Sequence, residues 1–193
     1  MANLPHNTTE AHDWSQIPAP EDDGAAAHLV GMALPSVSLG STQGDAVDLG
    51  ALKGLAVLYI YPMTGVPGVA LPDGWDMIPG ARGCTPQSCS FRDHFAELQE
   101  LGVDHLYGLS TQDTAYQTEA AERMHLPFAL LSDEGLALAD ALNLPRLEVE
   151  GKTLLKRMAL IAEDGVIAQC FYPVFPPDRN AGDVVNWLRA RGD

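Results

Sequence analysis

The stretch that most restricts the fold is residues 55–61, LAVLYIY, which is apolar or aromatic throughout and is ended by Pro62. A strand with one wet face alternates apolar and polar residues, so an unbroken run is typical of a strand buried on both faces. Such a strand needs a covering layer on each side. Strands alternating with helices, then a hairpin and a last helix, indicate an α/β fold with a mixed central β-sheet flanked by helices. The sequence predicts strands at 103–109 and 128–131, hairpins of 37–40 with 46–49 and of 154–162 with 166–172, and helices at 113–125, 134–142 and around 184–188.

The composition describes a globular chain without the marks of a nucleic-acid or membrane protein. Its 193 residues suffice for one domain with a real core, and its formal charge of −15 would repel nucleic acids and anionic membranes. No apolar run approaches the roughly 18–20 residues of a transmembrane helix. Residues 1–6 lack the basic and apolar regions of a signal peptide. We therefore expect no nucleic-acid or membrane partner and a cytoplasmic location, which a content of only three cysteines also favours.

The chain reads as one domain preceded by an extension. Residues 1–28 are rich in Ala, Asp, Pro and His without clear periodicity, so we expect a flexible N-terminal arm ahead of a domain at 29–193. The oligomeric state is left open between a monomer and a homodimer. The six histidines lack metal-ligand spacing, and no glycine-rich nucleotide loop follows a predicted strand. We expect neither a metal nor an organic cofactor.

Two cysteines lie where a helix is predicted to begin, in residues 83–93, GCTPQSCSFRD. Pro86 suits a first helical turn and Thr85 can serve as the N-cap, while apolar residues at 91, 95 and 98 continue the helix to about 101. Cys84 would then lie at a helix N-terminus, where unpaired N–H groups and the helix dipole favour an anion such as a thiolate. A free cysteine is more commonly a small buried hydrophobe. The glycine and the cap beside Cys84 instead predict an accessible, reactive thiol.

The spacing of the two cysteines bears on mechanism. Residues i and i+5 of an intact helix are about 8–9 Å apart between Cα atoms, whereas a disulfide needs roughly 4.4–6.8 Å. Cys84 and Cys89 therefore cannot be joined without unwinding the first turn. A reactive cysteine with a second one near but out of reach indicates a redox cycle better than a static crosslink.

Residues 83–93 resemble the active-site segment of the peroxiredoxins, specifically of the bacterioferritin-comigratory or Q-type group. The resemblance extends to YIYP at 59–62, GLST at 108–111 and LPFALLSD at 126–133, and it covers about residues 29–190. It implies a thioredoxin-like fold and a thiol peroxidase in which Cys84 matches the peroxidatic position and Cys89 the resolving position. It also implies thioredoxin, or a similar dithiol, as the reductant.

Arg157 is the candidate for stabilising charge at the site. A thiol peroxidase needs positive charge to hold the thiolate and to polarise the O–O bond as negative charge develops on the leaving oxygen. Arg157 stands in an otherwise apolar predicted strand, where an arginine is costly unless it has a partner. It also matches the strand arginine of the family. The alternative is an edge residue facing solvent, as we expect of Lys156.

The chain departs from the family pattern at the threonine. The family has Pro-x-x-x-Thr-x-x-Cys, but here Ala81 stands three residues before Cys84, and the nearest upstream match is Thr64. Nineteen residues separate Thr64 from Cys84, where the pattern has two. Either Thr64 keeps the catalytic role with extra chain looped out, or the hydroxyl is supplied otherwise.

The extra chain, residues 65–82, is too apolar to float free in water without cost. Loops of this length inside a compact domain are usually functional or disordered. We predict that the loop folds beside the Cys84 pocket with Trp75 as its anchor. The alternative is that it covers a distant apolar patch or makes a subunit contact.

The predicted function is a thiol-dependent peroxidase that reduces hydrogen peroxide and organic hydroperoxides through a Cys84 sulfenic acid and a Cys84–Cys89 disulfide. The alternative is a non-enzymatic redox sensor or partner-binding module using the same disulfide as a switch. Arg157 discriminates between them, because a sensor has less need of transition-state stabilisation. Cys170 lies among apolar residues of a predicted strand, and we assign it to structure.

Overall fold

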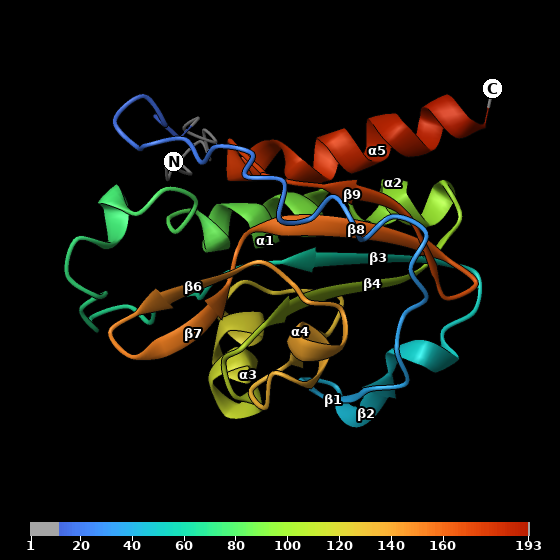
Figure 1. The fold of residues 1–193 in the computed structure, drawn as a ribbon, viewed down its shortest axis with the longest axis horizontal. Coiled ribbons are helices and arrows are strands. Elements are labelled where there is room, and N and C mark those ends of the chain that lie inside the picture. Colours follow the sequence, from blue (N-terminus) through green and yellow to red (C-terminus); the bar gives the residue numbers. More distant parts are fainter. Residues whose placement is uncertain (1–11, 193) are drawn as a thin grey trace, which may run out of the picture.

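The computed structural model describes residues 12–192, which form a layered α/β domain (Figure 1). The helices are α1 (Cys84–Asp93), α2 (Phe95–Glu100), α3 (Thr114–Arg123), α4 (Ala137–Ala141) and α5 (Asn180–Arg191), with short 3-10 turns η1 (Leu49–Ala51), η2 (Trp75–Met77) and η3 (Pro177–Arg179). The strands are β1 (Ser38–Ser41), β2 (Gly44–Asp48), β3 (Leu55–Ile60), β4 (Val103–Ser110), β5 (Leu130–Ser132), β6 (Arg146–Val149), β7 (Lys152–Leu155), β8 (Met158–Glu163) and β9 (Val166–Phe171).

Seven strands form the main sheet in the order β2-β1-β5-β4-β3-β8-β9, and β6 pairs with β7 in a separate hairpin. Strand β3 lies inside the sheet, parallel to β4 and antiparallel to β8, and β4 is parallel to β5. The remaining pairs are antiparallel. The sheet is therefore mixed, as the sequence predicts.

The two faces of β3 enter two different apolar clusters, because successive side chains of a strand point to opposite faces. Val57 and Tyr59 pack in a cluster with apolar residues of α1, α2, α3 and α5. Leu58 and Ile60 pack in a second cluster that includes residues of α4 and the segment 26–34. The strand is buried on both faces, which confirms the expectation from its unbroken apolar run.

The helix that carries the cysteines begins earlier than expected. Gly83, rather than Thr85, is the N-cap residue, and Cys84 is the first helical residue. Gly83 has φ 109°, a left-handed conformation that favours glycine. A Cβ built there would come within 2.4 Å of Pro177 and 3.0 Å of Trp14, so glycine also permits close packing. The predicted single helix to residue 101 is interrupted at His94, which separates α1 from α2.

One predicted strand, 154–162, is two strands. Strand β7 ends at Leu155 and pairs with β6, whereas β8 starts at Met158 and forms the predicted hairpin with β9. The turn between β6 and β7 has positive φ at Glu150 and Gly151 (49° and 75°), the pattern of a type I′ hairpin turn. Arg157 therefore lies in the link between β7 and β8, at the point where the chain passes from one sheet to the other.

Residues 1–11 of the predicted arm lie outside the described residues, and residues 12–28 lie against the domain without forming a helix or strand. The indole N–H of Trp14 donates to Asp178 Oδ1 at 3.1 Å. Asp23 accepts from Lys156 Nζ at 2.6 Å and from the Tyr172 hydroxyl at 2.7 Å. These contacts attach the extension to the segments around β8, β9 and η3. The division of the chain at residue 28 stays a prediction. Among residues 12–192, no helix combines the length and apolar character needed to cross a membrane.

Candidate active site

Cys84 lies at the wall of a cavity of about 600 Å³. The cavity is lined by segments 12–14, 63–65 and 82–86, together with Leu71, Trp75, Asp76 and Cys89. The side chain of Cys84 is only 4% exposed, so the expectation of an accessible thiol was wrong in that respect. The reason is that Cys84 packs into the apolar cluster of α1, α2, α3 and α5, and Arg157, 73 positions away in sequence, contacts it. Its position at the N-terminus of α1 is confirmed.

Arg157 contacts the sulfur directly. Its Nη2 lies 3.2 Å from Cys84 Sγ and also donates to the carbonyl oxygens of residues 80, 81 and 82, at 3.2, 2.9 and 3.1 Å. The residue is 2% exposed, and none of the ion pairs found within residues 12–192 includes it. A buried charge without an opposite charge is costly. A Cys84 thiolate would supply the missing negative charge.

Gln87 contacts the other terminal nitrogen of the guanidinium and is itself held by Asn180, and the sequence predicted neither residue. Gln87 Oε1 accepts from Arg157 Nη1 at 2.5 Å, and Gln87 Nε2 donates to Asn180 Oδ1 at 2.9 Å. Both side chains are buried. Gln87 is three residues after Cys84 and so shares its helix face, which is a usable sequence signal. Asn180 comes from the start of α5 and gives no such signal.

Cys89 lines the same cavity, half-buried on α1. Desolvation raises the pKa of this thiol above its ordinary value, opposed in part by the nearby Arg92 guanidinium. Cys84 and Cys89 are free thiols in the described residues. Because both belong to α1, their Cα atoms stay about 8–9 Å apart while the helix is intact. The structure thus describes a reduced arrangement in which the pair is close but not bonded.

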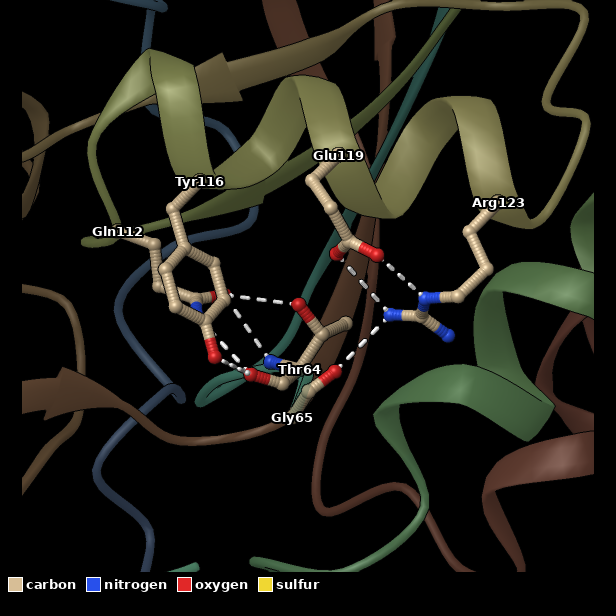
Figure 2. Close-up of polar contacts among 6 residues, drawn as sticks. All are labelled: Thr64, Gly65, Gln112, Tyr116, Glu119 and Arg123. Atoms are coloured by element: carbon tan, nitrogen blue, oxygen red, sulfur yellow. Dashed lines mark hydrogen bonds and ion pairs between the residues drawn. The ribbon is translucent and has the colours of Figure 1, made fainter. Parts of the chain in front are cut away.

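Thr64 also lines this cavity, although 19 residues separate it from Cys84 in sequence. Figure 2 shows its setting: the hydroxyl donates to Gln112 Oε1 at 3.2 Å, and the Tyr116 hydroxyl donates to the Thr64 carbonyl at 3.1 Å. The loop 65–82 therefore leaves from beside the cavity and returns to it. Among residues 12–192, no hydrogen bond joins Thr64 to Cys84. Its catalytic role stays a prediction.

The loop 65–82 packs beside the Cys84 cavity, as predicted, and Trp75 anchors it. Trp75 is 4% exposed and lines the cavity. It belongs to a small apolar cluster with Ala81 of the loop and with Val149 and Leu154 of the β6–β7 hairpin. In Figure 1 the loop and this hairpin extend from the same end of the domain. The loop thus forms part of the cavity wall rather than covering a distant patch.

The segment 12–14 completes the wall, which the sequence did not predict. Trp14 packs edge-on against Phe175, with ring centroids 6.2 Å apart, and its hydrogen bond to Asp178 ties it to η3. Ser90 of α1 donates to the carbonyl of the same Asp178 at 2.7 Å. A stretch with no periodic pattern is therefore part of the site.

Cys170 lies in β9 and packs against the second apolar cluster, in agreement with its assignment to structure. Burial raises the pKa of its thiol to about 11. Within residues 12–192, no group of three or more His, Cys, Asp and Glu side chains could hold a metal ion.

The sequence of this chain is similar to known proteins of one family. A sequence model of the Redoxin family matches residues 29–185. The chloroplastic peroxiredoxin Q of Oryza sativa subsp. japonica is 29% identical over 161 residues, which are 83% of this chain and 66% of that protein. The chain thus spans just under two thirds of the length of this relative.

Two solved structures show the same fold. Peroxidoxin BcpB from Mycobacterium tuberculosis has a TM-score of 0.66 at 24% identity, covering 83% of this chain and 96% of that one. The bacterioferritin comigratory protein of Xanthomonas campestris has a TM-score of 0.64 at 20% identity, covering 84% and 98%.

Proposed function

We propose that this chain, which belongs to the Redoxin family as a peroxiredoxin of the bacterioferritin-comigratory or Q type, is a thiol-dependent peroxidase acting on hydrogen peroxide and organic hydroperoxides. The thioredoxin-like fold implied by the sequence is confirmed by the likeness to the solved structures. The Xanthomonas campestris neighbour is described by its alkyl peroxide reduction activity, which supports the organic part of the substrate range. The name of the rice relative, peroxiredoxin Q, supports the same reaction class.

In the first step, the Cys84 thiolate attacks the peroxide oxygen that carries the hydrogen. The S–O bond forms as the O–O bond breaks, and the electron pair leaves on the other oxygen, which becomes water or an alcohol after protonation. Arg157 lies 3.2 Å from the sulfur, where it can stabilise both the thiolate and the charge that develops on the leaving oxygen. The unpaired N–H groups of the first turn of α1 act in the same direction.

In the second step, Cys89 attacks the Cys84 sulfenic acid, and the hydroxyl leaves as water with the thiol proton. A disulfide forms, for which the first turns of α1 must unwind because the cysteines are five residues apart. An external dithiol, for which we propose thioredoxin or a similar protein, then reduces the disulfide by thiol–disulfide exchange. Cys84, Cys89, Arg157 and Thr64 are the proposed catalytic residues.

One observation carries the proposal: a buried arginine without a carboxylate partner among the described residues lies in contact with a cysteine at a helix N-terminus. The alternative function, a non-enzymatic sensor, is not favoured. A sensor requires a reactive thiol, whereas a guanidinium held at the sulfur by Gln87 and backbone carbonyls favours turnover.

The experiment is peroxide consumption by the full chain with thioredoxin, thioredoxin reductase and NADPH. We expect catalytic loss of hydrogen peroxide and of cumene hydroperoxide, each with one NADPH oxidised per peroxide. Consumption of a single equivalent, followed by a stable disulfide that no dithiol reduces, would favour the sensor and count against the enzyme.

The setting of the protein is proposed as well. We propose a reducing compartment, the cytoplasm, supported by the low cysteine content, although the plant relatives are named as chloroplastic. We propose a monomer or a homodimer, with neither nucleic acid nor membrane as a partner, and the acidic charge supports the second point. Cell fractionation and light scattering of the purified protein are the corresponding measurements.

A further inference from the structure

The side chain of Gln112 forms three hydrogen bonds with Thr64. Gln112 Oε1 accepts from the Thr64 backbone N–H at 3.0 Å and from the Thr64 hydroxyl at 3.2 Å, while Gln112 Nε2 donates to the Thr64 carbonyl at 3.0 Å (Figure 2). The two backbone contacts resemble the pairing of neighbouring strands. Thr64 is 1% exposed and is one of the residues that line the Cys84 cavity.

These contacts fix the direction of the hydroxyl hydrogen bond. A backbone N–H can only donate and a carbonyl can only accept, so the Gln112 amide has one possible orientation. Its oxygen therefore faces the Thr64 hydroxyl. Because that oxygen carries no hydrogen, the hydroxyl must donate its proton to Gln112. Toward any further partner, Thr64 Oγ1 therefore has only lone pairs, which accept hydrogen bonds and donate none.

Further hydrogen bonds hold Gln112 and the backbone of residues 64 and 65 in place. Ser132 Oγ donates to the Gln112 carbonyl at 2.7 Å, and the Tyr116 hydroxyl donates to the Thr64 carbonyl at 3.1 Å. Arg123, paired with Glu119 at 2.8 Å, donates through Nη2 to the carbonyl of the next residue, Gly65, at 2.9 Å. Figure 2 shows these side chains of α3 and the loop before it converging on the Thr64–Gly65 bend.

We propose that Gln112 is a positioning residue that presents Thr64 Oγ1 to the Cys84 cavity as a hydrogen-bond acceptor for the O–H of a hydroperoxide. A guanidinium can only donate, so Arg157 and Thr64 are complementary in hydrogen bonding. An organic hydroperoxide has a single O–H, so an acceptor that holds this group selects the oxygen that the thiolate attacks; in hydrogen peroxide either O–H can be held. The other oxygen then takes the electron pair of the broken O–O bond. This inference rests on the proposed peroxidase function.

The test is a double-substitution cycle read out as the rate of Cys84 oxidation by peroxide in single-turnover stopped flow. The variants are Thr64→Val, Gln112→Leu and the two combined. We expect each single variant to lose roughly tenfold or more, as for the loss of one hydrogen bond in the transition state. We expect the double variant to be no slower than Thr64→Val, because Gln112 acts through the Thr64 hydroxyl.

Alkylation of Cys84 by iodoacetamide is the control reaction, since this reagent has no O–H to be held. We expect its rate to change less than twofold in all three variants. Gln112→Asn, which keeps the amide but shortens the reach, should reproduce Gln112→Leu if the leucine variant does not fold. Thr64→Ser keeps the hydroxyl and should stay close to wild type.

Three results would overturn the inference: a wild-type oxidation rate in both Gln112 variants, losses that multiply in the double variant, or an equal loss in alkylation. Failure of the proposed function looks different, because the wild-type chain itself would then leave peroxide unconsumed.

Discussion

The residues around Cys84 fall into two sets that are built in different ways. The inner wall is our name for Cys84, which lines the cavity, together with Arg157 and Gln87, which do not. These residues belong to α1 and to the link between two sheets, and Arg157 contacts Gln87 at 2.5 Å and Cys84 at 3.2 Å. The outer wall, defined as Trp14, Leu71 and Trp75, comes from a segment outside the Redoxin match and from the loop 65–82. It contacts the rest of the domain mainly through apolar packing and single hydrogen bonds.

We infer from this difference that the inner wall determines the reaction at the Cys84 sulfur, whereas the outer wall determines which peroxides reach it. Charge stabilisation depends on donors held at fixed distances from the reacting atom, which helices and strands provide. Irregular segments tolerate change more readily and commonly carry selectivity. Changes to the inner wall should therefore slow the reaction with every peroxide, whereas changes to the outer wall should alter which peroxides react well.

The largest effect is expected from the nucleophile. Cys84→Ser should abolish peroxide turnover with all substrates, because no other thiol contacts Arg157 in the described structure. Cys170→Ser is the matched control and should stay near wild type, since burial raises the pKa of that thiol to about 11. Steady-state NADPH oxidation measures both. Turnover by the Cys84 variant would show that the reaction does not take place at Cys84, Gln87 and Arg157.

Arg157→Met keeps bulk and removes charge. We expect the rate of Cys84 oxidation to fall by about 10²–10³, the usual loss when one donor to developing charge is removed, and by the same factor for hydrogen peroxide and for cumene hydroperoxide. Arg146→Met, which breaks an exposed pair with Asp140, is the control and should change the rate little. A loss confined to one peroxide would show that Arg157 acts in substrate selectivity, which would contradict the distinction between the inner and outer walls.

Cys89 also lines the cavity but is in neither of the two sets defined above. The pH dependence of its reaction distinguishes this step from the first one. Its pKa is raised by desolvation, so its thiolate fraction at neutral pH is smaller than that of an ordinary cysteine. Disulfide formation should accelerate as pH rises, by up to about tenfold per unit while the thiol is mostly protonated. Stopped-flow fluorescence after one equivalent of peroxide follows this step. A rate independent of pH between 6 and 9 would mean that helix unwinding, not the thiolate of Cys89, limits resolution.

The smallest effect is expected from the outer wall. Trp75→Ala should change the rate with cumene hydroperoxide a few-fold, in keeping with the contact of one side chain, and should leave hydrogen peroxide nearly unaffected. Trp14→Ala should act in the same direction. An equal change for both peroxides, or a loss of folded protein with intact kinetics per folded molecule, would show that these residues support the fold rather than select substrates.

The sequence was informative where the signals are local. The apolar run 55–61 predicted the buried strand β3, and the Cys84 segment predicted a cysteine at a helix N-terminus. An arginine in an apolar setting predicted the charged partner, and the contact of Arg157 with the sulfur is what the structure shows. The first two signals lie within the feature that they predict. Arg157 lies 73 positions from Cys84, and its signal is the cost of burying a charge without a partner.

The remainder could not be found in this way because it depends on long-range contacts. Asn180 reaches Gln87 across 93 positions, and Gln112 reaches Thr64 across 48. Cys84 is buried in the apolar cluster that also contains Val57 and Tyr59, and Arg157 contacts it from 73 positions away. Residues 12–14 and the loop line the cavity although their sequences have no periodicity. The β6–β7 hairpin was missed because its turn, Glu150-Gly151, is a weaker signal than the Asp164-Gly165 turn that follows.

The central claim is that the sulfur of Cys84 takes the oxygen from the peroxide and becomes a sulfenic acid. Trapping of that sulfenic acid tests the claim most directly. The Cys89→Ser protein is treated with one equivalent of hydrogen peroxide in the presence of dimedone, and the labelled peptide is identified by mass spectrometry. The account predicts one label per chain, on Cys84, with Cys170 unmodified. A label on Cys170, or an unlabelled chain after the peroxide has been consumed, would contradict it.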